Sequence, residues 1–456
     1  MTEPVAERVS EPVAERVTEP VAERVTGPVA EPVAGRVAEP VAEAAGWRRH
    51  MIDVRPLRHV PYRRLFLGNA VSHFGYQFTA VAVPVQMYAL TRSSFWVGLL
   101  GLAALVPLLL FGLWGGAVAD AMDRRLLLLV SSLVTWVATL GLLIQAVLGA
   151  GHPQLLLALV AAQATAFAVS SPTRQAIVPR LVERRELAAA NTLNSTMYSG
   201  TMAAGPLAAG VLIAQADIAA AYAVDAAAFT VALWATLRLP PLPPANGPSR
   251  AGWRDVRDGL RYIAAAPVLL LSFVIDIAAM VLAMPRALFP QVAAERFGGE
   301  DAIGWLYSAI ALGALLAGVT SGWIGRVRRQ GLALVASVVG WGLAVAAAGV
   351  APALWLAVAL LALGGAADLV SSVYRHTILQ SYAPDALQGR LQGVFTTVVA
   401  GGPRLGDLRA GTMAATTGVT VSWAGGGLAA AVVAVLLGLA FPALARYSGG
   451  RGPTAR

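Results

Sequence analysis

The chain has 456 residues, of which 57% are hydrophobic and only 13% are charged. Soluble domains contain about 45–50% apolar and about 25% charged residues, so this composition excludes a soluble globular protein and indicates one that crosses a membrane several times. Because there is no cysteine, disulfides and thiolate metal sites are excluded. The net charge of +9 would suit nucleic acid, but its distribution indicates membrane topology instead, and we expect no nucleic-acid partner.

Residues 1–60 precede most of the first apolar run and contain a repeat. The octad Glu-Pro-Val-Ala-Glu-Arg-Val-Ser/Thr begins at Glu3, Glu11 and Glu19. A proline in every octad removes a backbone donor and resists a continuous helix, and no cationic start followed by an apolar core marks a secretory signal. We expect a disordered cytoplasmic tail; a partner-binding tail is the alternative.

From Leu65 onward, apolar runs recur that reach the length of about 20 residues that a helix needs to cross a bilayer. They predict an all-α membrane protein with twelve transmembrane helices. The predicted spans are 65–89, 97–119, 126–149, 154–174, 188–214, 218–237, 268–289, 304–324, 332–350, 353–374, 391–415 and 421–444.

An even number of spans puts both termini on one side of the membrane. If that side is the cytoplasm, most arginines near the membrane are cytoplasmic, and only Arg92 and Arg296 lie clearly on the other side. The positive-inside rule therefore predicts a multi-pass protein of the plasma (inner) membrane with both termini cytoplasmic.

The longest internal loop divides the spans into two sets of six. The predicted parts are an N-terminal bundle at 61–237, a cytoplasmic linker at 238–267, a C-terminal bundle at 268–446 and a cytoplasmic tail at 447–456. The linker begins with a stiff proline-rich stretch. Its segment Trp253–Ile263 has the pattern of a short amphipathic helix on the inner membrane surface.

Three short motifs match between the two halves, about 200 residues apart. Their positions are Ser-Ser-x-x-Arg ending at Arg174 and Arg375, Arg-Arg beginning at Arg124 and Arg328, and Gly-Pro beginning at Gly205 and Gly402. Since each pair lies at topologically equivalent places, the motifs indicate two pseudo-symmetric six-helix bundles related by a parallel repeat.

A charged hairpin between the second and third spans has the pattern Gly-x-x-x-Asp-x-x-Asp-Arg-Arg, from Gly116 to Arg125. With this hairpin, the chain resembles the major facilitator superfamily. The string VPVQMYALTRSS from Val83, GGAVAD from Gly115 and PDALQGR from Pro384 are similar to the branch that contains the enterobactin exporter and the macrolide-efflux proteins.

The resemblance implies a secondary transporter whose two bundles rock around a central site. Its gating motif would consist of Gly116, Asp120, Asp123, Arg124 and Arg125. By this resemblance the Asp120 carboxylate would lie at the cytoplasmic start of span eleven when the inner gate is closed, because a helix N-terminus favours an anion. The second half has no equivalent aspartate. The alternative is that Asp120 only caps the turn.

Span five carries Gly200, Gly205, Pro206 and Gly210, which partly match a glycine–proline motif associated with antiporters. Small residues let helices approach closely, and proline bends a span. The match favours export over uptake.

Polar residues inside a span usually face a cavity or a partner. In span one, Asn69, His73 and Gln77 recur every four residues and so share one helix face. We interpret this face as a wall of the central cavity, with Asn194 of span five as a further candidate. Separately satisfied contacts between helices are the alternative.

Asp276, Asp368 and His73 are the candidates for proton coupling. A carboxylate removed from water binds a proton more readily, and histidine titrates near neutral pH. The alternative for the two aspartates is a hydrogen-bonded packing role.

Span eleven contains three more cavity candidates, Arg404, Asp407 and Arg409. Arg404 and Asp407 are three residues apart on a helix and can pair. Arg409 would then be an excess positive charge that attracts an anionic substrate, and Arg286 near the end of span seven would be another. Internal pairing or a lipid headgroup contact is the alternative for Arg409.

The sequence thus predicts a secondary active transporter that exports a small amphipathic molecule, a siderophore or a drug, by alternating access in exchange for protons. The alternatives are a proton-coupled uptake symporter on the same fold and a non-transporting membrane sensor or scaffold. No phosphate-binding loop, nucleophile–base pair or metal-ligand spacing stands out, so we expect no enzyme activity, cofactor or metal. The expected partners are the substrate, protons and the lipid bilayer, and the expected state is a monomer.

Replacing Asp120 with Asn should impair transport while leaving membrane insertion intact, because a neutral amide interacts more weakly with a helix N-terminus than a carboxylate does. Efflux measured at equal protein levels in the membrane fraction checks this. Normal efflux by the variant would rule out a latch at this position.

Overall fold

The computed structural model describes residues 53–121, 123–241, 253–299, 301–382 and 388–448. Within these ranges every regular element is helical. Most of the predicted tail at residues 1–60 and most of the tail at 447–456 lie outside the described residues.

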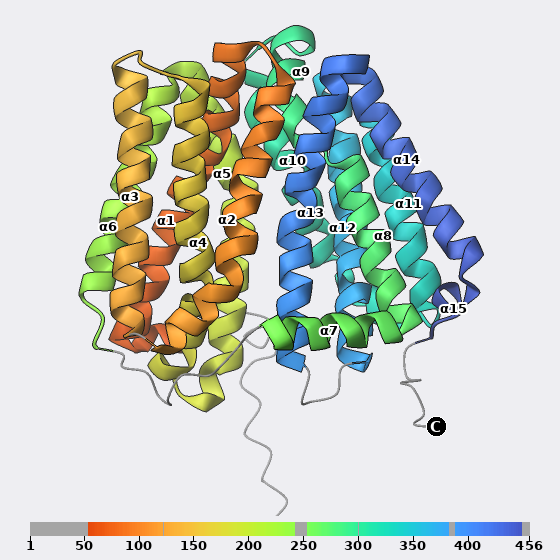
Figure 1. Ribbon diagram of the computed structural model, residues 1–456, viewed down its shortest axis with the longest axis horizontal. Coiled ribbons are helices and arrows are strands. Elements are labelled where there is room, and N and C mark those ends of the chain that lie inside the picture. The colour runs from red at the N-terminus through yellow and green to blue at the C-terminus, as the bar shows by residue number, and fades with distance from the viewer. Residues whose placement is uncertain (1–52, 122, 242–252, 300, 383–387, 449–456) are drawn as a thin grey trace, which may run out of the picture. The chain divides into compact units, whose positions relative to one another are not determined.

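The helices divide into a first set, a linker helix and a second set (Figure 1). The first set comprises α1 Val60–Thr91, α2 Ser94–Ala121, α3 Arg124–Val147, α4 Pro153–Leu181, α5 Leu187–Gln215 and α6 Ile218–Leu237. The linker helix is α7 Trp253–Ala265. The second set comprises α8 Pro267–Ala283, α9 Phe289–Arg296, α10 Asp301–Val319, α11 Gln330–Gly349, α12 Leu354–Tyr382, α13 Gln388–Thr417, α14 Val419–Ala440 and α15 Pro442–Ala445.

Ten segments of the described residues are long and apolar enough to cross a membrane, with α8 and α9 counted together. The predicted spans 65–89 and 391–415 coincide with α1 and α13, which are not among these ten. An all-helical membrane fold is therefore observed, whereas the crossing of the membrane by α1 and α13 stays a prediction.

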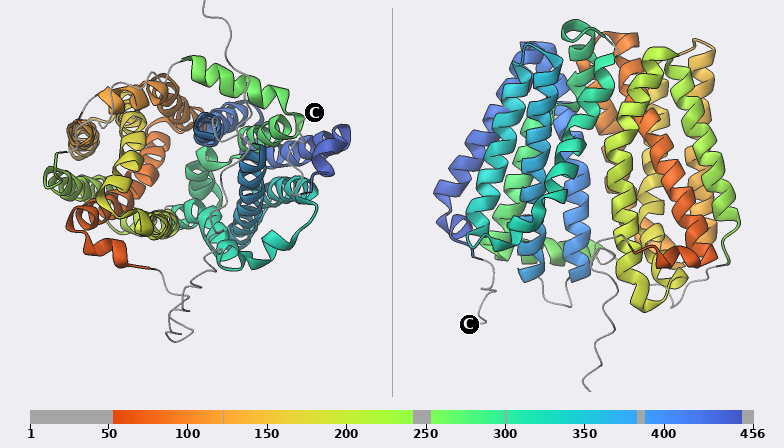
Figure 2. Two further views of the ribbon diagram at one scale, coloured as in Figure 1. Left: turned by 90° about the horizontal axis from the view of Figure 1, so that it is seen from below. Right: turned by 180° about the vertical axis from the view of Figure 1, so that it is seen from behind.

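Each set packs mainly within itself. In the first set, α1 packs on α5 and α6, and α4 packs on α2 and α3; in the second set, α11 packs on α12 and α14, and α8 packs on α13 and α14. The two sets meet mainly through α2 with α13 and through α5 with α10. Figure 2 shows the sets from below and from behind. We call the end that carries α9 and the turn between α1 and α2 the upper end, and the end that carries α7 the lower end (Figure 1).

Glycines at the upper end bring the two sets together backbone to backbone. A Cβ atom on Gly98 of α2 would lie 2.7 Å from the carbonyl oxygen of Asp407 in α13. A Cβ on Gly210 of α5 would lie 2.4 Å from the Cα of Gly304 in α10. Only glycine allows helices to approach so closely, and α2 and α13 diverge toward the lower end (Figure 1).

Buried hydrogen bonds fix the helices of the first set. Gln86 and Gln145 exchange two bonds of 3.0 Å, and the hydroxyl of Tyr222 donates to Oε1 of Gln86 at 2.7 Å. The hydroxyl of Thr79 donates to Oδ2 of the fully buried Asp225 at 2.6 Å. In a membrane, polar groups must find such partners inside the protein.

The predicted span 268–289 is not one continuous helix. α8 ends at Ala283, a 3₁₀ turn follows, and α9 begins at Phe289. Pro285 has no backbone donor and disfavours the helical conformation of the residue before it, which explains the break. The break places Arg286 in the interior between the two sets.

Gly210→Ala should weaken the contact between α5 and α10, because the added Cβ has no room and overpacking costs about 1–3 kcal/mol. We expect a lower midpoint of thermal unfolding for the purified protein. Gly200→Ala is the matched control on the same helix, because a Cβ there meets nothing within 4 Å. Equal midpoints for the two variants would contradict the close approach.

Candidate functional site

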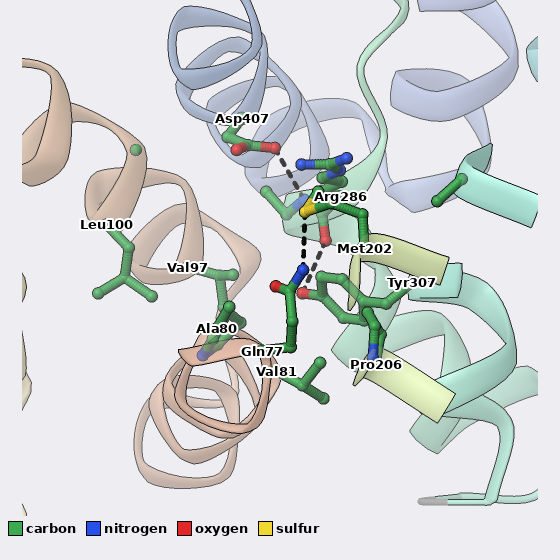
Figure 3. Close-up of a pocket in the computed structure, with 14 residues that line it drawn as sticks. Gln77, Ala80, Val81, Val97, Leu100, Met202, Pro206, Arg286, Tyr307 and Asp407 are labelled. Carbon is green, nitrogen blue, oxygen red and sulfur yellow. Dashed lines mark hydrogen bonds between the residues drawn. The ribbon is translucent and has the colours of Figure 1, made fainter. Parts of the chain in front are cut away.

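A pocket of about 170 Å³ lies between the two sets of helices. Most of its wall is apolar, and its polar groups come from both sets (Figure 3). The lining residues are Gln77, Ala80, Val81, Pro84, Val97, Leu100, Gly101, Met202, Pro206, Arg286, Ala287, Tyr307, Ala311 and Asp407. An apolar pocket with a few convergent polar groups is the usual form of a ligand site.

The polar groups of the pocket are held by local hydrogen bonds. Nε2 of Gln77 donates to the sulfur of Met202 at 2.7 Å, and the hydroxyl of Tyr307 donates to the carbonyl oxygen of Arg286 at 3.3 Å (Figure 3). Oδ1 of Asp407 accepts from the backbone N–H of Ala287 at 3.2 Å. The break after α8 therefore supplies both a backbone donor and the Arg286 side chain to the pocket.

Two hydrogen bonds close the space above the pocket. The hydroxyl of Tyr88 donates to Oε1 of Glu295 at 2.7 Å, and the hydroxyl of Ser94 donates to Oε1 of Gln291 at 2.6 Å. Both join the first set to α9. Both bonds lie at the upper end, where the glycine contacts also lie.

Below the pocket, the wall of the first set is exposed and polar. Tyr198 of α5 is 52% exposed and Tyr76 of α1 is 43% exposed. The Tyr198 ring lies edge-on to the ring of His73, with centroids 5.8 Å apart. Gly200 faces open space, whereas Gly205 packs against Gln77 at a distance that excludes a Cβ.

The second set contains a cluster of one arginine and two carboxylates. Arg375 of α12 forms an ion pair with Asp276 of α8, and both side chains are about 95% buried. The other end of the guanidinium lies 3.7 Å from Oδ1 of Asp368, whose side chain is 33% exposed. Of the two aspartates predicted for proton coupling, Asp276 is therefore engaged by an arginine and Asp368 is the more accessible.

The first set has a related pairing in which the partner of the arginine is an uncharged amide. Nη1 of Arg174 in α4 donates to Oδ1 of Asn69 in α1. Arg174 and Arg375 end the two copies of the Ser-Ser-x-x-Arg motif. Each arginine thus binds a polar residue on the first helix of its own set, which is Asn69 in one case and Asp276 in the other.

The remaining cavity candidates lie apart from one another. Arg404 donates to the carbonyl of Ala400 in its own helix, and Asn194 lies 3.5 Å from the hydroxyl of Tyr62. Arg409 points into the second set, where Nε donates to the carbonyl of Val281 at 3.2 Å and Nη1 to that of Ser422 at 2.9 Å.

The predicted gating motif is described in part. Asp123 caps α3, where Oδ1 accepts from the backbone N–H of Arg125 at 2.8 Å. The Arg125 guanidinium donates to the carbonyl of Leu237 at 2.7 Å, which ties the start of α3 to the end of α6. Gly116 and Asp120 lie in the part of α2 whose helical backbone is described but whose side chains are not, so the latch stays a prediction.

Several residues that line the pocket, or that form the hydrogen bonds above it, could not be predicted from the sequence. Tyr307 and Met202 are ordinary residues of apolar helices, and Tyr88 and Glu295 lie near helix ends. The proline at position 285 beside Arg286 is the one local signal that could have indicated a broken helix at a site.

The sequence matches the family described as transmembrane secretion effectors over residues 52–447. The chain belongs to this family of the major facilitator superfamily. Enterobactin exporter EntS of Shigella boydii is 31% identical over 399 residues, which cover 85% of this chain and 94% of that protein. EntS of Escherichia coli is 30% identical with the same coverage. The chain is a multi-pass membrane transporter.

Solved structures of major facilitator transporters share the fold. The nucleoside transporter NupG aligns with a TM-score of 0.64 at 16% identity, covering 85% of this chain and 100% of that one. The peptide transporter POT in complex with sulfate gives 0.69 at 14% identity, with 86% and 96% covered. A bacterial homolog of the human lysosomal transporter Spinster, in an inward-facing conformation, gives 0.65 at 16% identity, with 86% and 97% covered. At such identities the likeness concerns the fold alone.

Asp276→Asn should destabilise the protein much more than Asp368→Asn does. Removing one partner of a buried ion pair costs about 3–5 kcal/mol, whereas Asp368 is a third exposed and makes only a long contact. Thermal unfolding of the two purified variants in the same detergent checks this. A larger loss for Asp368→Asn would show that the second carboxylate, not the first, holds Arg375.

Proposed function

We propose that the chain exports a small amphipathic molecule, a siderophore or a drug, by alternating access in exchange for protons. The observation that carries the proposal is the pocket between the two sets of helices, above which the upper end is closed. A site that two bundles share, with contacts that close it at the upper end, suits a carrier that exposes the site to one side at a time.

The direction of opening follows from the arginines. Those at the lower end include Arg64, Arg125, Arg261 and Arg326, whereas Arg92 and Arg296 lie at the upper end. By the positive-inside rule the lower end is cytoplasmic. The closed upper end would then be the outer one, and substrate would reach the pocket from the cytoplasm, as the first step of export requires.

The nature of the cargo is supported by the relatives. The similar proteins of Shigella boydii and Escherichia coli are named enterobactin exporters, and their alignment covers almost their whole length. The apolar lining of the pocket, with Gln77, Arg286 and Asp407 at separate points, suits an amphipathic molecule that offers a few polar groups.

Asp368 is our choice for the coupling residue. It is the more accessible of the two carboxylates beside Arg375, so one negative charge of the cluster is in excess while Arg375 and Asp276 balance each other. A proton on Asp368 would remove this excess without breaking the buried pair. Of the other two candidates, His73 lies beside the ring of Tyr198, and Asp276 is already paired with the buried Arg375.

Asp368→Asn should uncouple substrate movement from proton movement. In proteoliposomes with an enclosed pH indicator, a catecholate siderophore or a macrolide added on the cytoplasmic side should release lumenal protons through the native chain. The variant should still move the probe down its gradient, with proton release reduced by about tenfold or more. Asp217→Asn, the same substitution at the cap of α6, is the matched control.

Two outcomes would contradict the proposal. Proton release by Asp368→Asn that equals that of the native chain would exclude Asp368 as the coupling residue. Co-entry of protons with the probe would indicate uptake by symport in place of export.

A further inference from the structure

The two halves of the protein neutralise equivalent arginines unequally. Arg375 of the second set lies between two carboxylates, Asp276 and Asp368. Arg174 of the first set has the amide of Asn69 as its hydrogen-bond partner. Within the part of the chain that the structure describes, no carboxylate lies within ion-pair distance of Arg174.

This difference gives the two clusters different formal charges. The cluster of Arg375 with its two aspartates carries one negative charge in excess, and the pairing of Arg174 with Asn69 carries one positive charge. A charged group inside a membrane protein is expensive and usually has a partner or a function. In the second half, Asp276 and Asp368 of the chain itself balance the charge of Arg375. In the first half, Arg174 can accept an anion as its partner.

Arg174 lies where such a partner can reach it. It is only partly buried, and Asn69 lies on the same face of α1 as His73 and, two turns further on, Gln77, which lines the pocket. Below the pocket this wall also presents the ring of Tyr198, which is half exposed and touches His73 edge-on. A positive charge and exposed aromatic rings therefore share one wall.

We propose that Arg174, oriented by Asn69, binds the carboxylate of an aromatic molecule. The proposal rests on the proposed function, since the ligand would be the transported molecule, and it names its chemical class. A planar guanidinium matches a carboxylate with two parallel N–H donors, and Asn69 occupies only one of its nitrogens. The rings of Tyr198 and His73 offer edges and faces to an aromatic body.

The test compares two probes of nearly the same size and shape, the anion 2-naphthoate and the neutral 2-naphthamide. Their equilibrium binding is measured with the full-length chain in lipid nanodiscs, and binding to empty nanodiscs is subtracted. The native chain should prefer the naphthoate. Arg174→Gln should lower the affinity for naphthoate by about tenfold and leave that for naphthamide within about twofold.

Asn69→Asp is the sharper variant, because it keeps Arg174 and copies the arrangement of the second half. It places a carboxylate beside the guanidinium and should lower naphthoate affinity as much as Arg174→Gln does. Asn69→Ala removes the amide without adding a charge and should retain the preference for naphthoate. Arg185→Gln, the same change at an exposed residue of the 3₁₀ turn before α5, should have no effect.

The proposal is overturned if the native chain binds both probes equally, or if Arg174→Gln and Asn69→Asp leave the ratio of the two affinities unchanged. The binding assay does not depend on transport. Export of a siderophore or macrolide without any charge preference in binding would leave the proposed function intact and remove the anion site. Charge-selective binding without transport of any probe would do the reverse.

Discussion

The contact of backbone with backbone at the upper end is the constraint on which the rest of the structure depends. Where α2 meets α13 and α5 meets α10, no atom beyond the glycine hydrogens fits between the helices. This contact joins the two sets at one end, positions the pocket directly beneath, and lets the helices diverge toward the other end. Packing brings the two sets close together. The hydrogen bonds of Tyr88 and Ser94 to α9 also fix their relative orientation, because hydrogen bonds are directional.

Charge balance is the second constraint, and it works within each set. Both halves place an arginine at the same position of a repeated motif, and both satisfy it with a residue of the first helix of the set. The placement of the arginine and of its partner helix recurs in both halves, but the partner is an amide in the first and a carboxylate in the second.

Hydropathy and arginine placement were sufficient to predict the helical membrane fold, because each span is specified by its own residues. The pairing of Arg375 with Asp276 could not be predicted, since it depends on the rotation of α8 against α12, which no local pattern encodes. Arg409 is a second example. Its position on span eleven suggested that it faces the cavity, but the rotation of α13 directs its side chain to the carbonyls of Val281 and Ser422. The break before Arg286 was readable in principle, because proline acts on its own neighbours.

The small size of the pocket has a consequence for the breadth of the cargo. Ligand pockets usually measure about 300–1,000 Å³, so a space of about 170 Å³ encloses a single ring or a short side arm. The rest of a larger molecule would extend beyond the residues that line this pocket, and they would constrain its shape little. Such a carrier would discriminate strictly on one substituent and tolerate variety in everything attached to it.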